Sequence, residues 1–165
     1  MSVNKVQYNG DTPALQPGEI IRFNTRSTRQ PLAINSQSKN VPLKIHINAS
    51  EGKVFVTNQR LVYLTSTNTS RGDIESFCIN FNQLPKLKFT HALKSALFGA
   101  NYWEFMFYSP SEGICDGFPR EEYFQGSITF KDGGMFDFGA AINEAINDVV
   151  NNPHIDDELP RYSEL

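Results

Sequence analysis

The residues whose types and spacing suggest a binding chemistry form the run Leu159-Pro160-Arg161-Tyr162 near the end of the sequence. Pro160 fixes its own φ at about −65° and disfavours the helical region for Leu159, so the run is predisposed to an extended conformation. An already extended segment loses little conformational entropy when it docks in an aromatic groove. We expect Leu159 and Pro160 to lie on such a groove and Tyr162 to fill a neighbouring pocket, with its hydroxyl as a polar group.

This run resembles the Leu-Pro-x-Tyr variant of the PY motif, which is the ligand of WW domains, especially those of HECT-type ubiquitin ligases. The resemblance implies that Leu159, Pro160, Arg161 and Tyr162 recruit a WW-domain protein. Because a four-residue pattern recurs by chance in many proteins, the alternative is an idle C-terminal tail. The flanking residues 152–165 are polar and acidic, as expected of an exposed tail.

A second candidate chemistry is the binding of phosphoinositides or an anionic membrane surface. Residues 1–94 contain 12 Lys and Arg against 5 Asp and Glu, whereas residues 95–165 contain 3 against 13. We predict Arg22, Arg26, Arg29 and Lys39 as possible lipid-binding residues, because they lie in or beside the first long connection between strands. The alternative is that the two oppositely charged halves neutralise each other within the fold.

Other classes of function find little support in the residue patterns. We find no nucleophile elbow, no phosphate-binding glycine loop and no matched Cys/His pair, so we predict no catalytic residues and no enzyme activity. The two cysteines and three histidines lack metal-ligand spacing, so neither a metal site nor a cofactor is expected. A sequence pI of about 5.6 without an aromatic basic stripe argues against direct nucleic-acid binding.

The elements expected to position these residues are mostly strands. Apolar and polar residues alternate in the strongest five segments, and two further runs flank Asn58-Gln59 as a hairpin. The expected strands are 18–23, 43–48, 53–57, 60–65, 77–82, 86–89, 103–108 and 124–130. The turn Asp132-Gly133-Gly134 is expected to join the last of these to a short strand segment at 135–138. From about Phe138 to Asn151 the apolar spacing changes to three and four residues, which predicts one amphipathic helix.

This order of elements predicts a mainly β fold with one C-terminal helix. We expect an antiparallel β-sandwich or open barrel of seven or eight strands, capped by the helix because sheets alone leave apolar surface uncovered. We divide the chain into a flexible lead-in (1–17), one domain (18–151) and an acidic tail (152–165).

Three segments resemble GRAM domains, which have a pleckstrin-homology-like fold, and in particular WW-domain-binding protein 2 and its relatives. They are the hairpin Gly52–Thr65, the run Phe98–Tyr102 and the run Gly133–Gly139. The resemblance implies a non-enzymatic adaptor, with transcription coactivation as in animal relatives as an alternative. The sequence departs from those relatives by lacking their long Pro/Tyr/Gly-rich tail and by an apparent insertion at about 24–42.

The expected location is the cytoplasm, with the nucleus as a further possibility. No apolar run approaches the roughly 20 residues that span a bilayer, and the first residues lack the apolar core of a signal peptide. We therefore expect a protein that is neither secreted nor transmembrane.

Overall fold

The computed structural model describes residues 1–39, 44–65 and 74–151, and it confirms a mainly β protein with one C-terminal helix. The first antiparallel sheet has the order β1 (Ser2–Val3), β9 (Ser76–Asn80), β8 (Arg60–Thr65), β7 (Gly52–Thr57) and β4 (Ile21–Asn24). The second has the order β10 (Thr90–Lys94), β11 (Tyr102–Ser109), β12 (Glu122–Thr129), β5 (Leu32–Ser36) and β6 (His46–Ala49). A separate hairpin consists of β2 (Tyr8–Asn9) and β3 (Thr12–Pro13).

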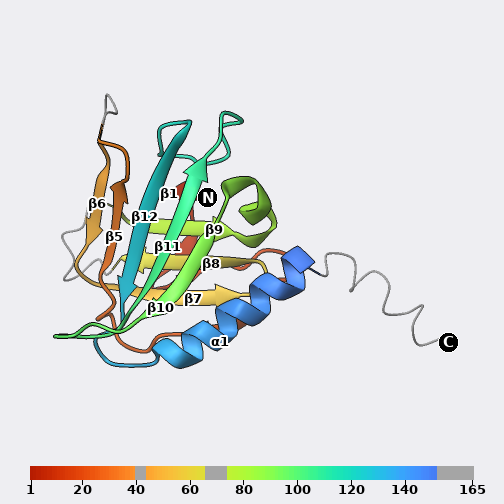
Figure 1. Cartoon of the computed structure of the whole chain (residues 1–165). Helices are drawn as coiled ribbons and strands as arrows, with labels where there is room; N and C mark the ends of the chain where they lie inside the picture. The colour runs from red at the N-terminus through yellow and green to blue at the C-terminus, as the bar shows by residue number, and fades with distance from the viewer. Residues whose placement is uncertain (40–43, 66–73, 152–165) are drawn as a thin grey trace.

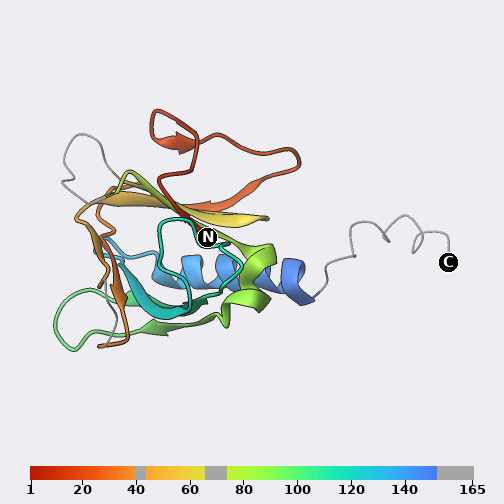
Figure 2. The same cartoon turned by 90° about the horizontal axis from the view of Figure 1, so that it is seen from above.

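The two sheets form the layers of a sandwich in which their strands cross (Figure 1, Figure 2). The helix α1 (Met135–Ile146) packs on β4, β7 and β11 along one open side and continues as a π-helical turn, Asn147–Asn151. A 3-10 helix, Phe81–Leu87, connects the two sheets after β9. The main apolar core lies between the sheets and under α1.

Alternation of side chains along β11 and β12 builds the centre of this core. Trp103, Phe105 and Phe107 of β11 are fully buried, and the residues between them face outward. The register places Phe105 opposite Gly126, where an added Cβ would lie 2.1 Å from the Phe105 ring. Glycine is therefore required at position 126 to leave room for the aromatic ring. Phe107 stacks on Phe124 across the same pair of strands, with ring centroids 5.3 Å apart.

The helix closes the core through Phe138. Its ring packs edge-on against Trp103, with centroids 5.2 Å apart, and also contacts Phe23 and Phe130 at 5.9 and 4.9 Å. Phe138 shares the inner face of α1 with four other buried residues, Met135, Gly139, Ile142 and Ala145, at helical spacing. One aromatic side chain thus joins the helix to strands of both sheets.

Three segments differ from the sequence-based expectation. The strand expected at 135–138 is wrong, because Gly134 has φ of 87° and opens α1 at Met135. The strand expected at 86–89 is replaced by the end of the 3-10 helix, where Lys88 has φ of 50°, and β10 begins only at Thr90. The apparent insertion at 24–42 contains β5, which pairs with β12 and β6 and brings the two sheets to ten strands.

Residues 1–17, expected to be a flexible lead-in, lie against the domain. β1 pairs with β9, and the side chains of Met1 and Val6 are buried because they are apolar and fit beside the first sheet. Within the described ranges, no helix is long and apolar enough to cross a membrane.

A buried ion pair fastens the end of this lead-in to the β7–β8 turn. Glu19 accepts two hydrogen bonds from the guanidinium of Arg60, at 2.7 and 3.0 Å, and one from the Thr57 hydroxyl at 2.7 Å. Burial alone would raise the pKa of Glu19, but these bonds and one from the backbone N–H of Gln16 outweigh it and hold the pKa below its usual range. The carboxylate is therefore charged and fully bonded.

We predict that Gly52→Ala destabilises the domain. An added Cβ would lie 2.3 Å from Cζ of the buried Tyr63 ring, whose hydroxyl is fixed by a bond to the Gln30 carbonyl. Overpacking of this kind costs about 1–3 kcal/mol, which urea unfolding would measure. Gly139→Ala is the matched control, since its Cβ meets only the far end of the Leu93 side chain. Equal stability of wild type and Gly52→Ala would contradict the packing described.

We predict a larger loss for Glu19→Gln, because the variant leaves the Arg60 charge buried without its partner. Removing one member of a buried pair costs about 3–5 kcal/mol. The stabilisation by Glu19 is present above the ordinary carboxylate pKa and is lost as the pH falls through the lowered folded-state pKa. As the pH falls, the free energies of unfolding of wild type and Glu19→Gln, measured by urea titration, should therefore converge. Asp11→Asn, which removes an exposed ion pair, should resemble wild type at every pH.

Candidate functional site

The structure does not bring the four predicted lipid-binding residues together. Arg26 and Arg29 lie in the β4–β5 loop, and Lys39 lies beyond the other end of β5. Arg22 pairs with Asp148 of the π-helical turn at 2.8 Å, and Arg29 pairs with Asp132 at 2.9 Å. Two of the four cations are therefore already neutralised. The predicted WW-binding residues, 159–162, lie outside the described residues.

A surface that the sequence reasoning missed lies at the end of the sandwich near Arg26 and Arg29. Leu97 and Phe98, in the β10–β11 loop, are each 90% exposed, and Phe136 on the first turn of α1 is 71% exposed. Leu93 also contributes exposed apolar surface and contacts α1 beside Gly139. Figure 1 shows the β10–β11 loop projecting from the same end of the molecule as the connection from β12 to α1.

Backbone hydrogen bonds hold the segments of this end in place. The N–H of Lys131 donates to the Arg29 carbonyl at 3.3 Å, and the N–H of Phe130 donates to the Asn101 carbonyl at 2.9 Å. The β4–β5 loop, the start of β11 and the β12–α1 connection are thereby joined. We call the surface formed by segments 25–31, 94–101 and 130–137 the loop end.

The loop end carries a modest positive charge beside its apolar residues. It contains four cations, Arg26, Arg29, Lys94 and Lys131, and two carboxylates, Asp132 and Asp137, which gives a net charge of +2. A hydrogen bond from Ser27, together with Arg29, lowers the pKa of Asp132, so this carboxylate stays ionised and occupies one arginine. The exposed apolar side chains and the net positive charge of the loop end suit contact with a surface that has an apolar interior and anionic groups outside.

A small hollow of about 240 Å³ lies where the β4–β5 loop meets the beginning of α1. Arg26, Asp132 and the helix-opening Gly134 line it together with Gln30. Gln30 is almost fully buried, and its Oε1 has no hydrogen-bond partner although its Nε2 donates to Ser27. The lining of the hollow therefore combines the Arg26 cation with the Asp132 carboxylate, above a buried acceptor of Gln30 that has no partner.

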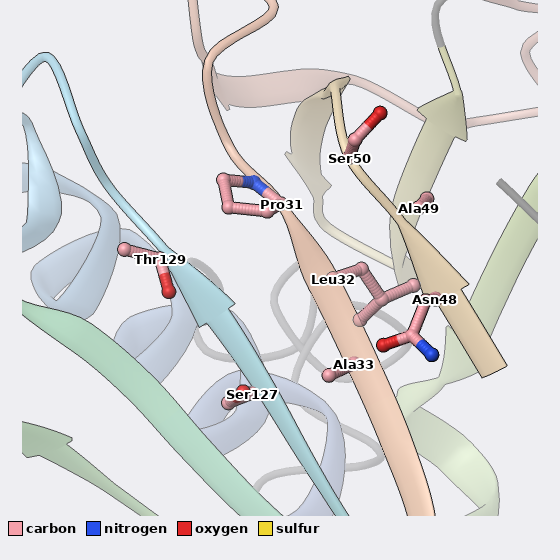
Figure 3. A pocket seen from close by; sticks show the side chains of 8 residues that line it. All are labelled: Pro31, Leu32, Ala33, Asn48, Ala49, Ser50, Ser127 and Thr129. Atoms are coloured by element: carbon pink, nitrogen blue, oxygen red, sulfur yellow. The ribbon is translucent and has the colours of Figure 1, made fainter. Parts of the chain in front are cut away.

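A larger pocket of about 410 Å³ lies on the second sheet, across β12, β5 and β6. Figure 3 shows small and uncharged side chains from these strands around it, among them Ala33, Asn48 and Ser127. None of the described residues that line it carries a side chain that titrates near neutral pH.

The two cysteine thiols are buried. Burial raises the pKa of the Cys78 and Cys115 thiols, which disfavours their thiolate forms. In the part of the chain that the structure describes, no group of three or more His, Cys, Asp or Glu is arranged to hold a metal ion. His91 accepts a hydrogen bond from Trp103 Nε1 at 3.0 Å, and burial lowers its pKa.

One signal in the sequence could have identified Leu97 and Phe98 as candidate surface residues. They are two consecutive apolar residues directly before a glycine, between two alternating segments, and this breaks the alternation. Alternation alone does not tell whether such a pair is buried or exposed. That distinction depends on whether another element covers the loop.

Comparisons with known proteins do not assign this chain to a family. No family model matches the sequence, and no curated protein matches it. Among solved structures, a chain described as "The 8S snRNP Assembly Intermediate" is similar with a TM-score of 0.44 and 16% identity, over 76% of this chain and 78% of that chain. A similarity at this level supports no conclusion about fold or function.

Proposed function

We propose that this protein is a non-enzymatic adaptor whose folded domain docks on an anionic membrane surface through the loop end. The observation that carries the proposal is the exposure of Leu97 and Phe98, which are both 90% exposed on a projecting loop. Soluble proteins rarely place two large apolar side chains side by side in water without a partner surface. The nearby cations supply attraction to anionic lipid.

The expected membrane affinity is modest. Complete burial of a leucine or phenylalanine side chain contributes about 1.5–3 kcal/mol, and each cation near an anionic leaflet contributes about 1 kcal/mol. The carboxylates Asp132 and Asp137 offset part of the second contribution. Binding is therefore reversible and responds to ionic strength, as befits an adaptor recruited to a surface and released from it.

The buried thiols and the uncharged described residues around the pocket on β12, β5 and β6 favour an adaptor over an enzyme. The loop end contains polar groups that can bind a lipid head group, but Asp132 in the hollow disfavours a multiply charged phosphate. We therefore favour a general anionic surface over a single phosphoinositide. We propose the cytoplasm as its location, with the nucleus as an alternative.

A second activity is proposed from the sequence of residues 159–162. The run Leu159-Pro160-Arg161-Tyr162 has the composition and the proline-fixed backbone of a WW-domain ligand. With both activities, the protein would bring a WW-domain partner, such as a HECT-type ubiquitin ligase, to a membrane. Transcription coactivation, as in the animal relatives that the sequence resembles, is the alternative function of the protein.

We predict that Leu97→Asp with Phe98→Asp abolishes binding to vesicles of phosphatidylcholine and phosphatidylserine in a flotation assay. The change removes two apolar anchors and adds two charges of the repelled sign. Ile20→Asp is the matched control, because Ile20 is 65% exposed but lies before β4, away from the loop end.

Wild-type binding should also weaken with salt, because screening reduces the attraction of exposed charges. Vesicles with phosphoinositide at equal total charge separate a general anionic surface from one specific lipid. Undiminished flotation of the double variant, or dependence on phosphoinositide alone, would contradict the docking mode proposed.

We predict that Tyr162→Ala and phosphorylation of Tyr162 each prevent binding of an isolated WW domain in calorimetric titrations. Phosphorylation adds roughly −1.5 to −2 charges to a side chain that must enter a largely apolar pocket. Tyr123→Ala, at a tyrosine exposed on β12, controls for a general loss of aromatic contacts. Vesicle binding should survive Tyr162→Ala, and full WW affinity of the phosphorylated chain would refute this assignment.

A further inference from the structure

A third pocket, of about 290 Å³, lies near the C-terminal end of α1, away from the loop end. Five separate elements form it: the lead-in, the β7–β8 turn, the end of β9, the start of the 3-10 helix and the π-helical turn. Among the residues that the structure describes, six line the pocket; five of these carry side-chain carboxamides and none is charged: Gln16, Gln59, Asn80, Asn82, Gln83 and Val149. A wall made almost entirely of carboxamides combines donors and acceptors without a net charge.

Hydrogen bonds to the surrounding protein fix the direction of three of these carboxamides. Gln59 Nε2 donates to the Pro17 carbonyl at 3.0 Å, so its Oε1 is left to accept. Gln83 Oε1 accepts from the amino group of Met1, so its Nε2 is left to donate. Asn80 Oδ1 accepts from the Cys78 thiol at 3.7 Å, which leaves Nδ2 to donate. The pocket thus offers oriented donors and an acceptor.

The remaining carboxamides and the apolar residues around them complete the surface. Gln16 and Asn82 make no side-chain hydrogen bond to the residues that the structure describes, so both can donate and accept. Val149 adds an apolar wall. Leu15 and Ile20, which are 48% and 65% exposed, lie beside Gln16 and beside the β7–β8 turn that carries Gln59.

The chemistry of this wall selects an uncharged ligand that both donates and accepts hydrogen bonds. A charged ligand would lose its hydration without gaining an opposite charge. A sugar would find no aromatic ring on which to pack among the described lining residues. A peptide fits best, because each backbone unit carries one donor and one acceptor and its side chains can meet Val149, Leu15 and Ile20.

We propose that this pocket is a peptide-binding site, and that it takes a short, extended, uncharged segment of a partner protein with a carboxamide side chain between apolar residues. This site lies apart from the loop end and from residues 159–162. It would give the adaptor a further contact that does not depend on the membrane or on a WW domain.

The elements around the pocket are held in position before any ligand binds. The buried pair of Glu19 and Arg60 fixes the lead-in against the turn that carries Gln59. The pair of Arg22 and Asp148 holds the turn that carries Val149 against β4. A site that is already ordered loses little entropy on binding, so a short peptide can suffice.

The test is a titration of the full chain, labelled with ¹⁵N, with the capped tripeptide acetyl-Val-Asn-Val-amide. We expect saturable shifts of the side-chain NH₂ signals of Asn80, Asn82 and Gln83 at millimolar peptide. Asn82→Asp should weaken the affinity by about tenfold or more, because it removes donors and places a charge in a neutral site. Asn143→Asp, the same change on the exposed face of α1, should leave the affinity unaltered.

Two results would overturn the proposal. The first is the absence of saturable shifts at these side chains in wild type. The second is equal binding of the charged analogue acetyl-Val-Asp-Val-amide, because a neutral lining should reject it. The backbone spectrum of Asn82→Asp shows in the same experiment that the variant is folded, so loss of binding cannot be mistaken for unfolding. The double variant at Leu97 and Phe98 should bind the tripeptide normally.

Discussion

The arrangement of the whole molecule depends on the packing of Phe138 between the two sheets. Its ring contacts Trp103 of the second sheet and Phe23 of the first, and these contacts hold the helix that carries it against both sheets. Burial of a phenylalanine at such a junction is worth several times the thermal energy. The position of α1 then determines which loops meet its beginning and which elements meet its end.

The two candidate surfaces are consequences of that single placement. The beginning of α1 brings Phe136 to the end of the molecule that displays Leu97 and Phe98, and its continuation brings Val149 to the carboxamide pocket. A run of 17 helical residues extends about 25 Å at 1.5 Å per residue, so the surfaces are well separated. A domain resting on a membrane by one end would leave the other accessible to a protein.

The parts of the fold that could be predicted from the sequence are those in which buried apolar residues recur at a regular spacing. The strands around Trp103 and Phe124 and the helix after Phe138 follow from alternation and from three- and four-residue spacing. β5 escaped notice because only Leu32 and Ile34 mark it within a polar segment, and its place is set by distant pairing with β12. The exposure of Leu97 and Phe98 and the meeting of five carboxamides likewise arise only when distant segments come together.

Trp103, whose indole N–H donates a hydrogen bond to His91, is an intrinsic fluorescent probe of the core. Trp103 is the only tryptophan, is fully buried, and lies against the ring of Phe138. Because burial lowers the pKa of His91, its neutral ring is favoured, and Nδ1 accepts the hydrogen bond that the Trp103 indole N–H donates. The fluorescence emission wavelength of Trp103 therefore reports whether α1 is packed on the core. Fluorimetry can follow the detachment of α1 without an added label.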